Sequence, residues 1–560
     1  MFRLPALVLL ATLVAPLAKA QAPAQLTEAV GGGVTFTDSN LPIVVIETPN
    51  AQGIPDEPKV TALMGVIDNG PGERNRLGDP YAGYAGYIGI ETRGASSQAV
   101  YPKKSYALET RRADGENRNV RLLGLPREND WILYAPYADK SLTRNVLAYE
   151  FARRMGGYAV RTRYVEVVLN GEYRGVYVLM ERIKQDDDRV PIDELTPDDN
   201  GGDALTGGYI VKVDRPAFGD DGWASPYLPE GFANRQVFYQ YHDPNPSNLT
   251  DAQRTYIRSY ITQFEAMMDG DGWTDPASGY PAWLDVDSAV DFLLLNELGK
   301  NVDGYRLSSF LYKARDSAGG RLYLGPIWDF NFAFGIADYY GAERPAGYQV
   351  AFAEAEDSHQ NPFWWRKLAR DPAFIARAQA RWQALRTGAL AEDSLMSFVD
   401  EQAALLDEAQ ARNFRRWPVL GSYVWANSFI GSTYASEVAF LKSWLRQRLQ
   451  WLDANLPLGQ LIPDNPDPID VPVLVTRIGA PAPNPFTQTA TLRFDLDESQ
   501  PIRVTVHDVL GREVSRPFEG IADSGEDQTV VVDGSVFPPG VYLVRIVGLR
   551  FDITHTLVKL

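Results

Sequence analysis

Cysteine is absent from this 560-residue chain, and histidine occurs only four times. Without thiols the chain can form neither disulfides nor zinc–thiolate sites, and it has no cysteine nucleophile. The histidines, His242, His359, His507 and His555, are far apart and not in ligand spacing, which argues against a histidine zinc site and a Ser-His-Asp triad. Chemistry in this chain is therefore expected to rest on carboxylates, amides, hydroxyls, lysine or arginine, and a Ser-Lys pair stays open.

Positive charge is also scarce. Acidic residues outnumber Lys and Arg by 72 to 54, which gives a formal net charge of −18 and a pI near 4.8. Nucleic-acid phosphates repel such a chain unless a local basic groove overrides the mean field, so we expect no nucleic-acid partner. The composition, 45% hydrophobic and 11% aromatic, allows a sizeable core, and the length predicts several domains or one large domain with an appendage.

Long apolar runs are missing except at the N-terminus. There Met1-Phe2-Arg3 precedes an apolar stretch that ends in Ala18-Lys19-Ala20, a pattern typical of a secretory signal with cleavage after Ala20. The stretch is short and interrupted by proline, which disfavours a membrane span. We expect a signal peptide at 1–20, no membrane-spanning segment, and an exported protein that is secreted or held at the cell surface.

One segment combines a strand, a break and an isolated carboxylate. It runs from Leu322 to Gly335, and in it Asp329 lies among Trp328 and three phenylalanines. A carboxylate in apolar surroundings needs a cation, hydrogen-bond donors or water. A metal on nucleotide phosphates is one such partner, because Mg²⁺ binds one or two carboxylates plus phosphates. The alternative is that Asp329 caps the following turn.

The N-terminal part is β-rich, with strands expected at 41–48, 59–68, 87–92 and 131–134. Arg93 to Ser97 is a small polar break that can expose backbone N–H groups to an anion. Strand alternation then places Lys104 on the face of Tyr106, with Lys103 on the opposite face, which predicts Lys104 as the inward lysine. An inward lysine after such a loop suits a phosphate, and the alternative is a surface lysine.

A second isolated carboxylate, Asp303, follows the helix predicted at 286–298. The chain continues through a predicted strand at 309–313 and a turn at 316–320 back to Leu322, so Asp303 and Asp329 are expected at the same end of one hairpin. Phosphoryl transfer needs a carboxylate at the attacking hydroxyl, a second on metal and a cation on the phosphates. Asp303, Asp329 and Lys104 supply these three types, although Asp303 is equally suited to a structural turn.

The C-terminal part divides into helices, a linker and short strands. Helices are expected at 251–267, 373–385, 393–414 and 434–455, and a helix at 139–155 precedes a hairpin at 164–180. Pro- and Asp-rich residues 459–476 form a linker, and residues 477–560 alternate as in a small all-β sandwich. The resulting domains are 21–458, β-rich to about 215 and mostly helical beyond, and 477–560. The overall fold class is α+β.

The motifs fall in a specific order along residues 40 to 455. They are Arg93-Gly94-x-Ser96-Ser97, Pro102-Lys103-Lys104-Ser105-Tyr106, the Trp131 strand with Asp139 and Arg144-Asn145, Asn170-Gly171-x-Tyr173-x-Gly175-x-Tyr177-x-x-x-Glu181, Gly207-Gly208-Tyr209 with Asp214, Asn301-x-Asp303, and Pro326-x-Trp328-Asp329. In this combination the chain resembles the CotH kinase family, secreted relatives of the spore-coat protein H kinases. The resemblance implies an atypical two-lobed protein-kinase-like fold that binds ATP and Mg²⁺ or Mn²⁺.

The resemblance also implies site residues. Asp303 is the expected catalytic residue, and Lys104 is expected at the phosphates, Glu181 near the nucleotide-binding hinge and Arg93 as a further nucleotide-binding residue. The expected metal-binding residues are Asp329, Asn331 and Ser308. Two of these depart from the kinase pattern: Asn331 stands where many relatives have a second Asp, and Ser308 takes the place of a metal-binding Asn, so the second metal position is weakened. No G-x-G-x-x-G loop is present.

The tail is similar to the C-terminal sorting domain of type IX secretion. It carries Pro483-Asn484-Pro485-Phe486, Val506-His507-Asp508-x-x-Gly511-Arg512 and Pro539-Gly540-Val541-Tyr542-Leu543-Val544-Arg545. This implies a secretion machinery as partner and export across an outer membrane, while the residues alone equally fit an adhesive β-sandwich.

Three functions follow from these observations. The first is a secreted kinase that transfers the γ-phosphate of ATP to a Ser/Thr hydroxyl of an extracellular or surface protein. The second is a surface or matrix binding protein whose kinase-like domain recognises nucleotide or a partner without turnover, which the weakened metal site favours. The third is a glycan hydrolase using the two carboxylates, against which Lys104 and the motif order argue.

Overall fold

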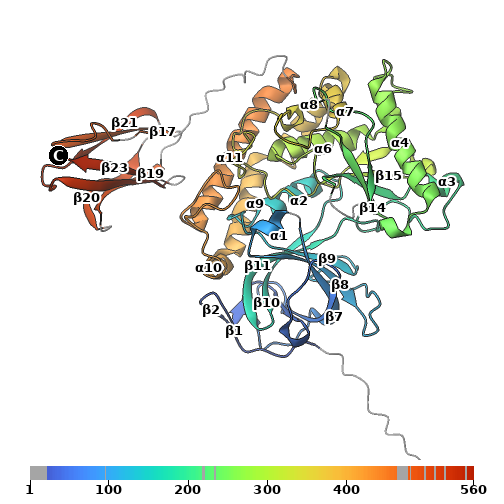
Figure 1. Cartoon of the computed structure of the whole chain (residues 1–560), viewed down its shortest axis with the longest axis horizontal. Coiled ribbons are helices and arrows are strands. Elements are labelled where there is room, and N and C mark those ends of the chain that lie inside the picture. Colours follow the sequence, from blue (N-terminus) through green and yellow to red (C-terminus); the bar gives the residue numbers. More distant parts are fainter. Residues whose placement is uncertain are drawn as a thin grey trace, which may run out of the picture. The chain divides into compact units, whose positions relative to one another are not determined.

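The computed structural model describes residues 22–94, 96–216, 221–232, 235–462, 477–479, 481–496, 500–509, 512–522, 525–548 and 552–560 (Figure 1). The predicted signal peptide at 1–20 and most of the predicted linker at 459–476 lie outside these residues. The chain divides into two compact units, one of residues up to 134 together with 163–179, the other of residues 135–162 together with 180 onward.

A closed barrel of seven strands forms the first unit, in the order β10-β11-β9-β8-β7-β5-β4. The closing pair is β10 with β4, which run parallel with Glu166 opposite Ile43. The β10–β11 connection is the predicted turn, where Asn170 and Gly171 both take the positive φ that a tight hairpin requires. The barrel strands are β4 (Ile43–Glu47), β5 (Val60–Ile67), β7 (Tyr84–Arg93), β8 (Ser105–Arg111), β9 (Asp130–Tyr134), β10 (Thr162–Leu169) and β11 (Glu172–Glu181).

Short elements cover one end of this barrel. Phe36 stacks on Tyr173 of β11 with ring centroids 4.6 Å apart, within a buried cluster that also contains Val34, Val45 and Val168. These apolar contacts tie the first strands of the chain to the barrel. The short elements are β1 (Ala29–Gly31), β2 (Val34–Phe36), β3 (Asp38–Ser39) and β6 (Asn75–Arg76), whereas the short helix α1 (Ser96–Val100) lies in the connection from β7 to β8.

The second unit is mostly helical, and its central helix is α6. This helix packs against α2, α8 and α11 (Figure 1). Its N-terminus is capped by Asp285, whose side chain accepts from the Ser288 N–H. The helices are α2 (Arg144–Arg154), α3 (Gly202–Leu205), α4 (Asp251–Asp269), α5 (Tyr280–Trp283), α6 (Val286–Gly299), α7 (Phe363–Leu368), α8 (Pro372–Arg386), α9 (Glu392–Leu405), α10 (Asp407–Arg416) and α11 (Tyr434–Asn455).

A five-stranded sheet, ordered β13-β14-β12-β15-β16, completes this unit. The hairpin β15–β16 is antiparallel, with Leu311 opposite Leu324 and Lys313 opposite Leu322. The start of β15 and the end of β16 therefore lie at the same end of the sheet, as the sequence predicted. The strands are β12 (Tyr209–Val213), β13 (Gly222–Ala224), β14 (Phe238–Asp243), β15 (Ser309–Lys313) and β16 (Leu322–Leu324).

Two predicted helices differ from the structure. The helix predicted at 139–155 begins at Arg144, because the Asp139 carboxylate accepts from the Ser141 hydroxyl and the Arg144 N–H and so stabilises a turn in which Leu142 has φ +61°. The helix predicted at 393–414 is broken at Leu406 into α9 and α10. Leu406 is fully buried, so the break directs this side chain into the core.

The tail is an all-β domain of two sheets, β17-β18-β21 and β20-β19-β22-β23. Residues of both sheets share one apolar core that includes Leu492, Phe494, Val504 and Val544. The sequence did not predict the strand β20. The strands are β17 (Arg477–Ile478), β18 (Thr489–Leu496), β19 (Gln500–Asp508), β20 (Glu513–Ala522), β21 (Gly525–Asp533), β22 (Gly540–Val547) and β23 (Asp552–Lys559).

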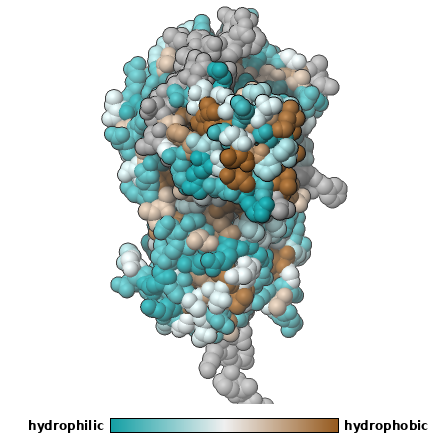
Figure 2. All heavy atoms as spheres, turned by 90° about the vertical axis from the view of Figure 1, so that its left-hand side faces the viewer, coloured by the Kyte–Doolittle hydropathy of each residue, from teal (hydrophilic) through white to brown (hydrophobic). Residues whose placement is uncertain are grey.

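The mixed α and β character and the all-β tail agree with the predicted fold class, and the β-rich N-terminal part is a closed barrel, which the sequence did not predict. No helix of the described part of the chain is long and apolar enough to cross a bilayer. The face drawn in Figure 2 is mostly hydrophilic, with hydrophobic groups separated by polar ones.

Candidate active site

The Asp303 loop follows α6 and is anchored by a buried carboxylate. Glu297 accepts from the backbone N–H groups of Gln349 (2.8 Å) and Val350 (2.7 Å) and from the Tyr305 hydroxyl (2.9 Å). Arg448 completes the cluster at 3.1 Å. Burial raises the pKa of Glu297 and Arg448 opposes that rise. Two of these donors are backbone N–H groups and two are side chains, so the carboxylate joins α6 to Tyr305 of the following loop, to residues 349–350 and to α11.

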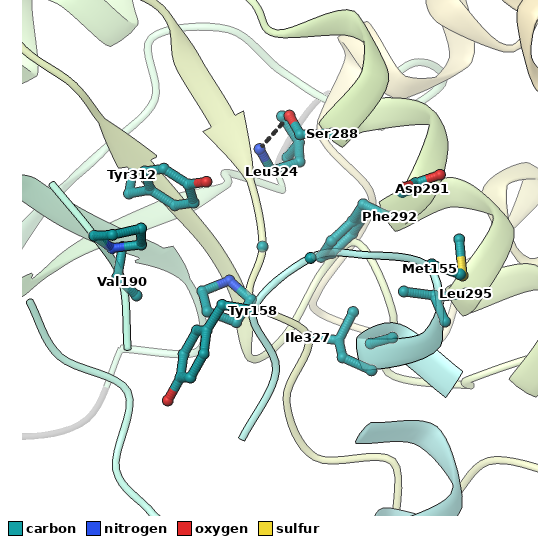
Figure 3. A pocket seen from close by; sticks show the side chains of 15 residues that line it. Met155, Tyr158, Val190, Ser288, Asp291, Phe292, Leu295, Tyr312, Leu324 and Ile327 are labelled. Atoms are coloured by element: carbon teal, nitrogen blue, oxygen red, sulfur yellow. Dashed lines mark hydrogen bonds between the residues drawn. The ribbon is translucent and has the colours of Figure 1, made fainter. Parts of the chain in front are cut away.

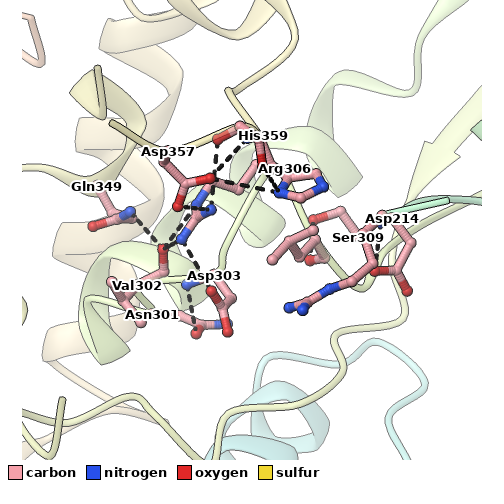
Figure 4. Close-up of polar contacts among 12 residues, drawn as sticks. Asp214, Asn301, Val302, Asp303, Arg306, Ser309, Gln349, Asp357 and His359 are labelled. Atoms are coloured by element: carbon pink, nitrogen blue, oxygen red, sulfur yellow. Dashed lines mark hydrogen bonds and ion pairs between the residues drawn. The ribbon is translucent and has the colours of Figure 1, made fainter. Parts of the chain in front are cut away.

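Asp303 itself is held at one oxygen. Its Oδ1 accepts from Nη2 of Arg306 at 3.0 Å (Figure 4), and among the described residues Oδ2 accepts no hydrogen bond. The side chain keeps 22% exposure. Burial raises its pKa, while the positive charges of Arg306 and Arg215 act in the opposite direction. The geometry suits a carboxylate that is fixed at one oxygen and can accept a proton or a hydroxyl at the other.

Asp329 occupies an unusual backbone conformation. Its φ is +60°, in the left-handed region that asparagine and aspartate tolerate better than most residues. The backbone on either side is fixed by α2: the Asp329 N–H donates to the Tyr149 hydroxyl at 3.3 Å, and the Phe330 N–H donates to Oδ1 of Asn145 at 2.7 Å. These two bonds fix the backbone that carries the Asp329 carboxylate.

The hairpin brings the two loops to one end of the sheet. Ser308 and Asp303 precede β15, and Asp329 and Asn331 follow β16. The ring of Trp328 packs against Phe310, the second residue of β15, with centroids 6.4 Å apart. The candidate catalytic residue and the candidate metal-binding residues thus share one end of the β15–β16 hairpin.

These donors fit a hard cation only in part. No group of three or more His, Cys, Asp or Glu side chains in the described part of the chain could hold a metal. Asp329 offers one carboxylate, Asn331 an amide oxygen and Ser308 a hydroxyl. Such a set cannot form a cage by itself, but it fits Mg²⁺ or Mn²⁺ that takes its remaining oxygen ligands from phosphates and water.

The lysine prediction is corrected by the barrel. Lys103 is the buried lysine, 2% exposed, with Nζ 4.9 Å from the Tyr177 ring centroid. Lys104 is half-buried and donates to the carbonyls of Gln98 and Tyr101, at the end of α1. The prediction extended the strand alternation to both lysines. It is wrong because β8 begins only at Ser105, so Lys103 and Lys104 precede the strand.

Lys104 nevertheless faces a polar cavity of the barrel unit, of about 360 Å³. Thr92, Tyr106, Asn170 and Arg174 also line it. Arg93, the last residue of β7, pairs with Ser105 in the strand register and is partly exposed. These two candidate nucleotide-binding residues belong to the barrel unit, whereas the remaining candidates belong to the helical unit.

Glu181 is fully buried and fully engaged. It accepts from the Arg161 guanidinium (2.7 Å), the Arg161 N–H (2.9 Å) and the Tyr158 hydroxyl (3.2 Å). A cavity of about 110 Å³ lies beside Tyr158, lined also by Phe292, Tyr312 and Ile327 (Figure 3). In its wall the Leu324 N–H donates to the Ser288 hydroxyl at 3.1 Å. The bonds of Glu181, the last residue of β11, therefore fix residues 158–161, which precede β10.

Sequence reasoning missed the partners that position the two carboxylates. Arg306, Asp357 and Tyr149 were not singled out, and Asn145 was noted only as part of a motif. The i,i+3 spacing of Asp303 and Arg306 was the available signal, since it suits an ion pair in a helical turn. Asp357 had no such signal, because its contact with Arg306 spans 51 residues.

Comparison with known protein families identifies the family of the region that contains the candidate site. A family model described as CotH kinase protein matches residues 90–452, well over half of the chain. The chain belongs to the CotH kinase family. The matched region of this CotH protein begins in β7, ends in α11 and contains every candidate site residue. A second model, described as Secretion system C-terminal sorting domain, matches residues 482–559, which supports a secreted or surface-held CotH protein. No curated protein matches the chain.

Proposed function

We propose that this CotH protein is a secreted atypical protein kinase that transfers the γ-phosphate of ATP to a Ser/Thr hydroxyl of an extracellular or surface protein. The single observation that carries the proposal is the placement of Asp303 and Asp329 at one end of the β15–β16 hairpin within a region that belongs to the CotH kinase family. The sorting domain supports export by a type IX-like machinery.

Asp303 is the proposed catalytic residue. Its Oδ1 is bound to Arg306, which leaves Oδ2 to accept the hydroxyl proton and to orient the hydroxyl oxygen toward the phosphorus. The opposing influences of burial and Arg306 on its pKa suit a base that receives a proton late in the transfer. Orientation is the main contribution expected, because phosphoryl transfer depends chiefly on positioning and electrostatics.

Asp329 is the proposed metal-binding carboxylate, with Asn331 and Ser308 as neutral oxygen donors. A divalent cation bound there would supply charge neutralisation on the phosphate oxygens. Within the chain, Asn145 and Tyr149 hold the backbone at Asp329 and Phe330, so the chain itself fixes the backbone that carries this carboxylate. With only one carboxylate, affinity for the cation is expected to depend strongly on the nucleotide.

Lys104 and Arg93 are proposed to contact the phosphates, and Glu181 to fix the segment next to the nucleotide. Support for Lys104 is its position on the polar cavity of the barrel. We further propose a signal peptide at 1–20, a CotH kinase-like domain of two lobes at 21–458, a linker at 459–476 and the sorting domain at 477–560.

A second candidate function is a nucleotide- or partner-binding protein without appreciable turnover. The observation that favours it is the metal site: within the described residues no cluster of three acidic or histidine side chains occurs, and Asn331 and Ser308 are uncharged.

Two measurements on the purified full-length protein distinguish the kinase from the binding protein. ATP binding with Mg²⁺, with Mn²⁺ and with EDTA is measured by calorimetry, and transfer of label from γ-labelled ATP to the protein and to generic acceptors is followed in parallel. Metal-dependent binding with transfer supports the kinase, and metal-dependent binding without transfer supports the second candidate. If ATP does not bind under any of these conditions, the kinase and the nucleotide-binding form of the second candidate are both wrong, and partner recognition alone is left.

A further inference from the structure

Arg306 is the connection between Asp303 and a distant acidic residue. Its side chain is 3% exposed. Nη2 donates to Asp303 at 3.0 Å, and Nη1 donates to Oδ2 of Asp357 at 2.8 Å (Figure 4). Nε and Nη2 also donate to the Val302 carbonyl at 3.1 and 3.0 Å. One guanidinium thus joins two carboxylates and the backbone of the Asp303 loop.

Asp357 is itself held in a defined orientation. Its Oδ1 accepts from the backbone N–H of His359 at 2.7 Å, and its pKa is lowered to about 2, against burial, by His359 and Arg306. The Phe352 ring lies 4.4 Å from the Arg306 guanidinium carbon. The guanidinium is therefore enclosed by an aromatic ring and two acids, and its rotation is restricted.

The segment that carries Asp357 contacts the Asp303 loop, and only a short stretch directly before Asp357 is exposed. Residues 353–356 are exposed, whereas Asp357 is only 13% exposed at the side chain. Upstream, Lys300 of the same loop donates to the carbonyls of Gly341, Arg344 and Ala346 at 2.6 to 3.0 Å. The chain from 341 to 357 is thus attached to residues 300–306 at both ends.

We propose that Asp357 is a positioning residue for Asp303: through Arg306 it fixes the orientation of the Asp303 carboxylate, and it thereby makes catalysis depend on the seating of the 341–357 segment. The predicted effect of Asp357 on kcat rests on the proposed function. Its predicted effect on the backbone of the Asp303 loop does not depend on any activity. An Arg306 that has lost Asp357 keeps Asp303 as its only carboxylate partner in Figure 4 and is otherwise held by the Val302 carbonyl. Its Nη1 side is then no longer fixed by a charge, so the Asp303 carboxylate would be held less firmly.

The test uses the full-length Asp357→Asn variant, which has the same shape but lacks the charge. Glu356→Gln is the matched control, because Glu356 is exposed and immediately adjacent. We expect Asp357→Asn to lower kcat about 10- to 100-fold, by the sensitivity of transfer to misplacement, with the KM for ATP changed less than about 3-fold. Asp357→Glu restores part of kcat. In the Asp303→Asn background the Asp357→Asn change has little further effect, since both act on the same carboxylate.

Hydrogen exchange separates this inference from the proposed function. Asp357→Asn is expected to speed amide exchange in residues 301–306 relative to wild type and Glu356→Gln, whether or not the wild type transfers phosphate. Unchanged exchange at 301–306 would overturn the positioning role. So would an active wild type in which Asp357→Asn raises KM and leaves kcat intact. A wild type without transfer, but with faster exchange in Asp357→Asn, contradicts the proposed function and supports the attachment.

Discussion

At the scale of single residues, buried acids in this CotH protein fall into two kinds. The negative charges of Glu297 and Asp357 are stabilised by arginines and by backbone N–H groups, which act to lower the pKa of both. Glu265 in α4 is different: it is 1% exposed, and among the described residues it accepts only from the hydroxyls of Ser225 (2.8 Å) and Tyr239 (2.9 Å). With no cation among these partners, burial dominates and raises the pKa of Glu265 from 4.5 to about 7.

This pKa predicts a pH dependence of stability. Because the folded-state pKa lies above the unfolded value, the folded protein retains a proton between pH 4.5 and 7 that the unfolded chain releases, so stability falls as pH rises through that interval. The loss from this group is about 3.5 kcal/mol at most, from roughly 1.4 kcal/mol per pKa unit. Glu265→Gln removes this contribution. Urea unfolding at pH 5 and pH 8 should show a smaller decline for Glu265→Gln than for wild type, with exposed Glu116→Gln as control; equal declines would contradict it.

At the scale of secondary-structure elements, the position of β12 depends on a close backbone approach. A Cβ at Gly207 would lie 2.0 Å from the Arg315 nitrogen and 2.4 Å from the Ala314 carbonyl carbon. These atoms belong to the chain that leaves β15. Gly208, the residue after Gly207, donates from its N–H to the Lys313 carbonyl at 2.9 Å. Only glycine permits this spacing without moving β12 away from β15.

Gly207→Ala is therefore expected to destabilise the helical unit by more than about 2 kcal/mol, because the clash is with backbone and not with a side chain that can rotate. Gly201→Ala in the preceding loop is the matched control, since a Cβ there meets nothing within 4 Å and should change stability by less than about 0.5 kcal/mol. Urea midpoints of both variants test this, and equal midpoints would show that β12 and β15 can separate at no cost.

How far the sequence predicts these elements depends on the range of the interactions that form them. The strand β15 and the helix α11 have the predicted bounds, because capping residues and periodicity within them are local signals. The parallel pairing of β10 with β4, which closes the barrel, joins segments far apart in the chain and leaves no local signal. The same holds within the site: the Asp303–Asp329 hairpin followed from adjacent strands, whereas Asp357 reaches Arg306 only through the folded chain.

At the scale of the whole molecule, the CotH region and the sorting domain have separate cores. Export and catalysis are therefore expected to be separable. In a host with the matching secretion machinery, a chain without residues 477–560 should remain inside the cell envelope, whereas full-length Asp303→Asn should reach the surface or the medium. Cell fractionation measures this. Export of the truncated chain at the full-length level would assign the tail another role.

The central claim is that Asp303 acts in the transfer step and Asp329 in metal–nucleotide binding. The most direct measurement compares ATP affinity in Mg²⁺ and single-turnover label transfer for wild type, Asp303→Asn and Asp329→Asn. We predict that Asp303→Asn keeps its Kd within about 3-fold and loses about 100-fold or more in rate, and that Asp329→Asn raises the Kd about 10-fold or more. Transfer at the wild-type rate by both variants would contradict the account.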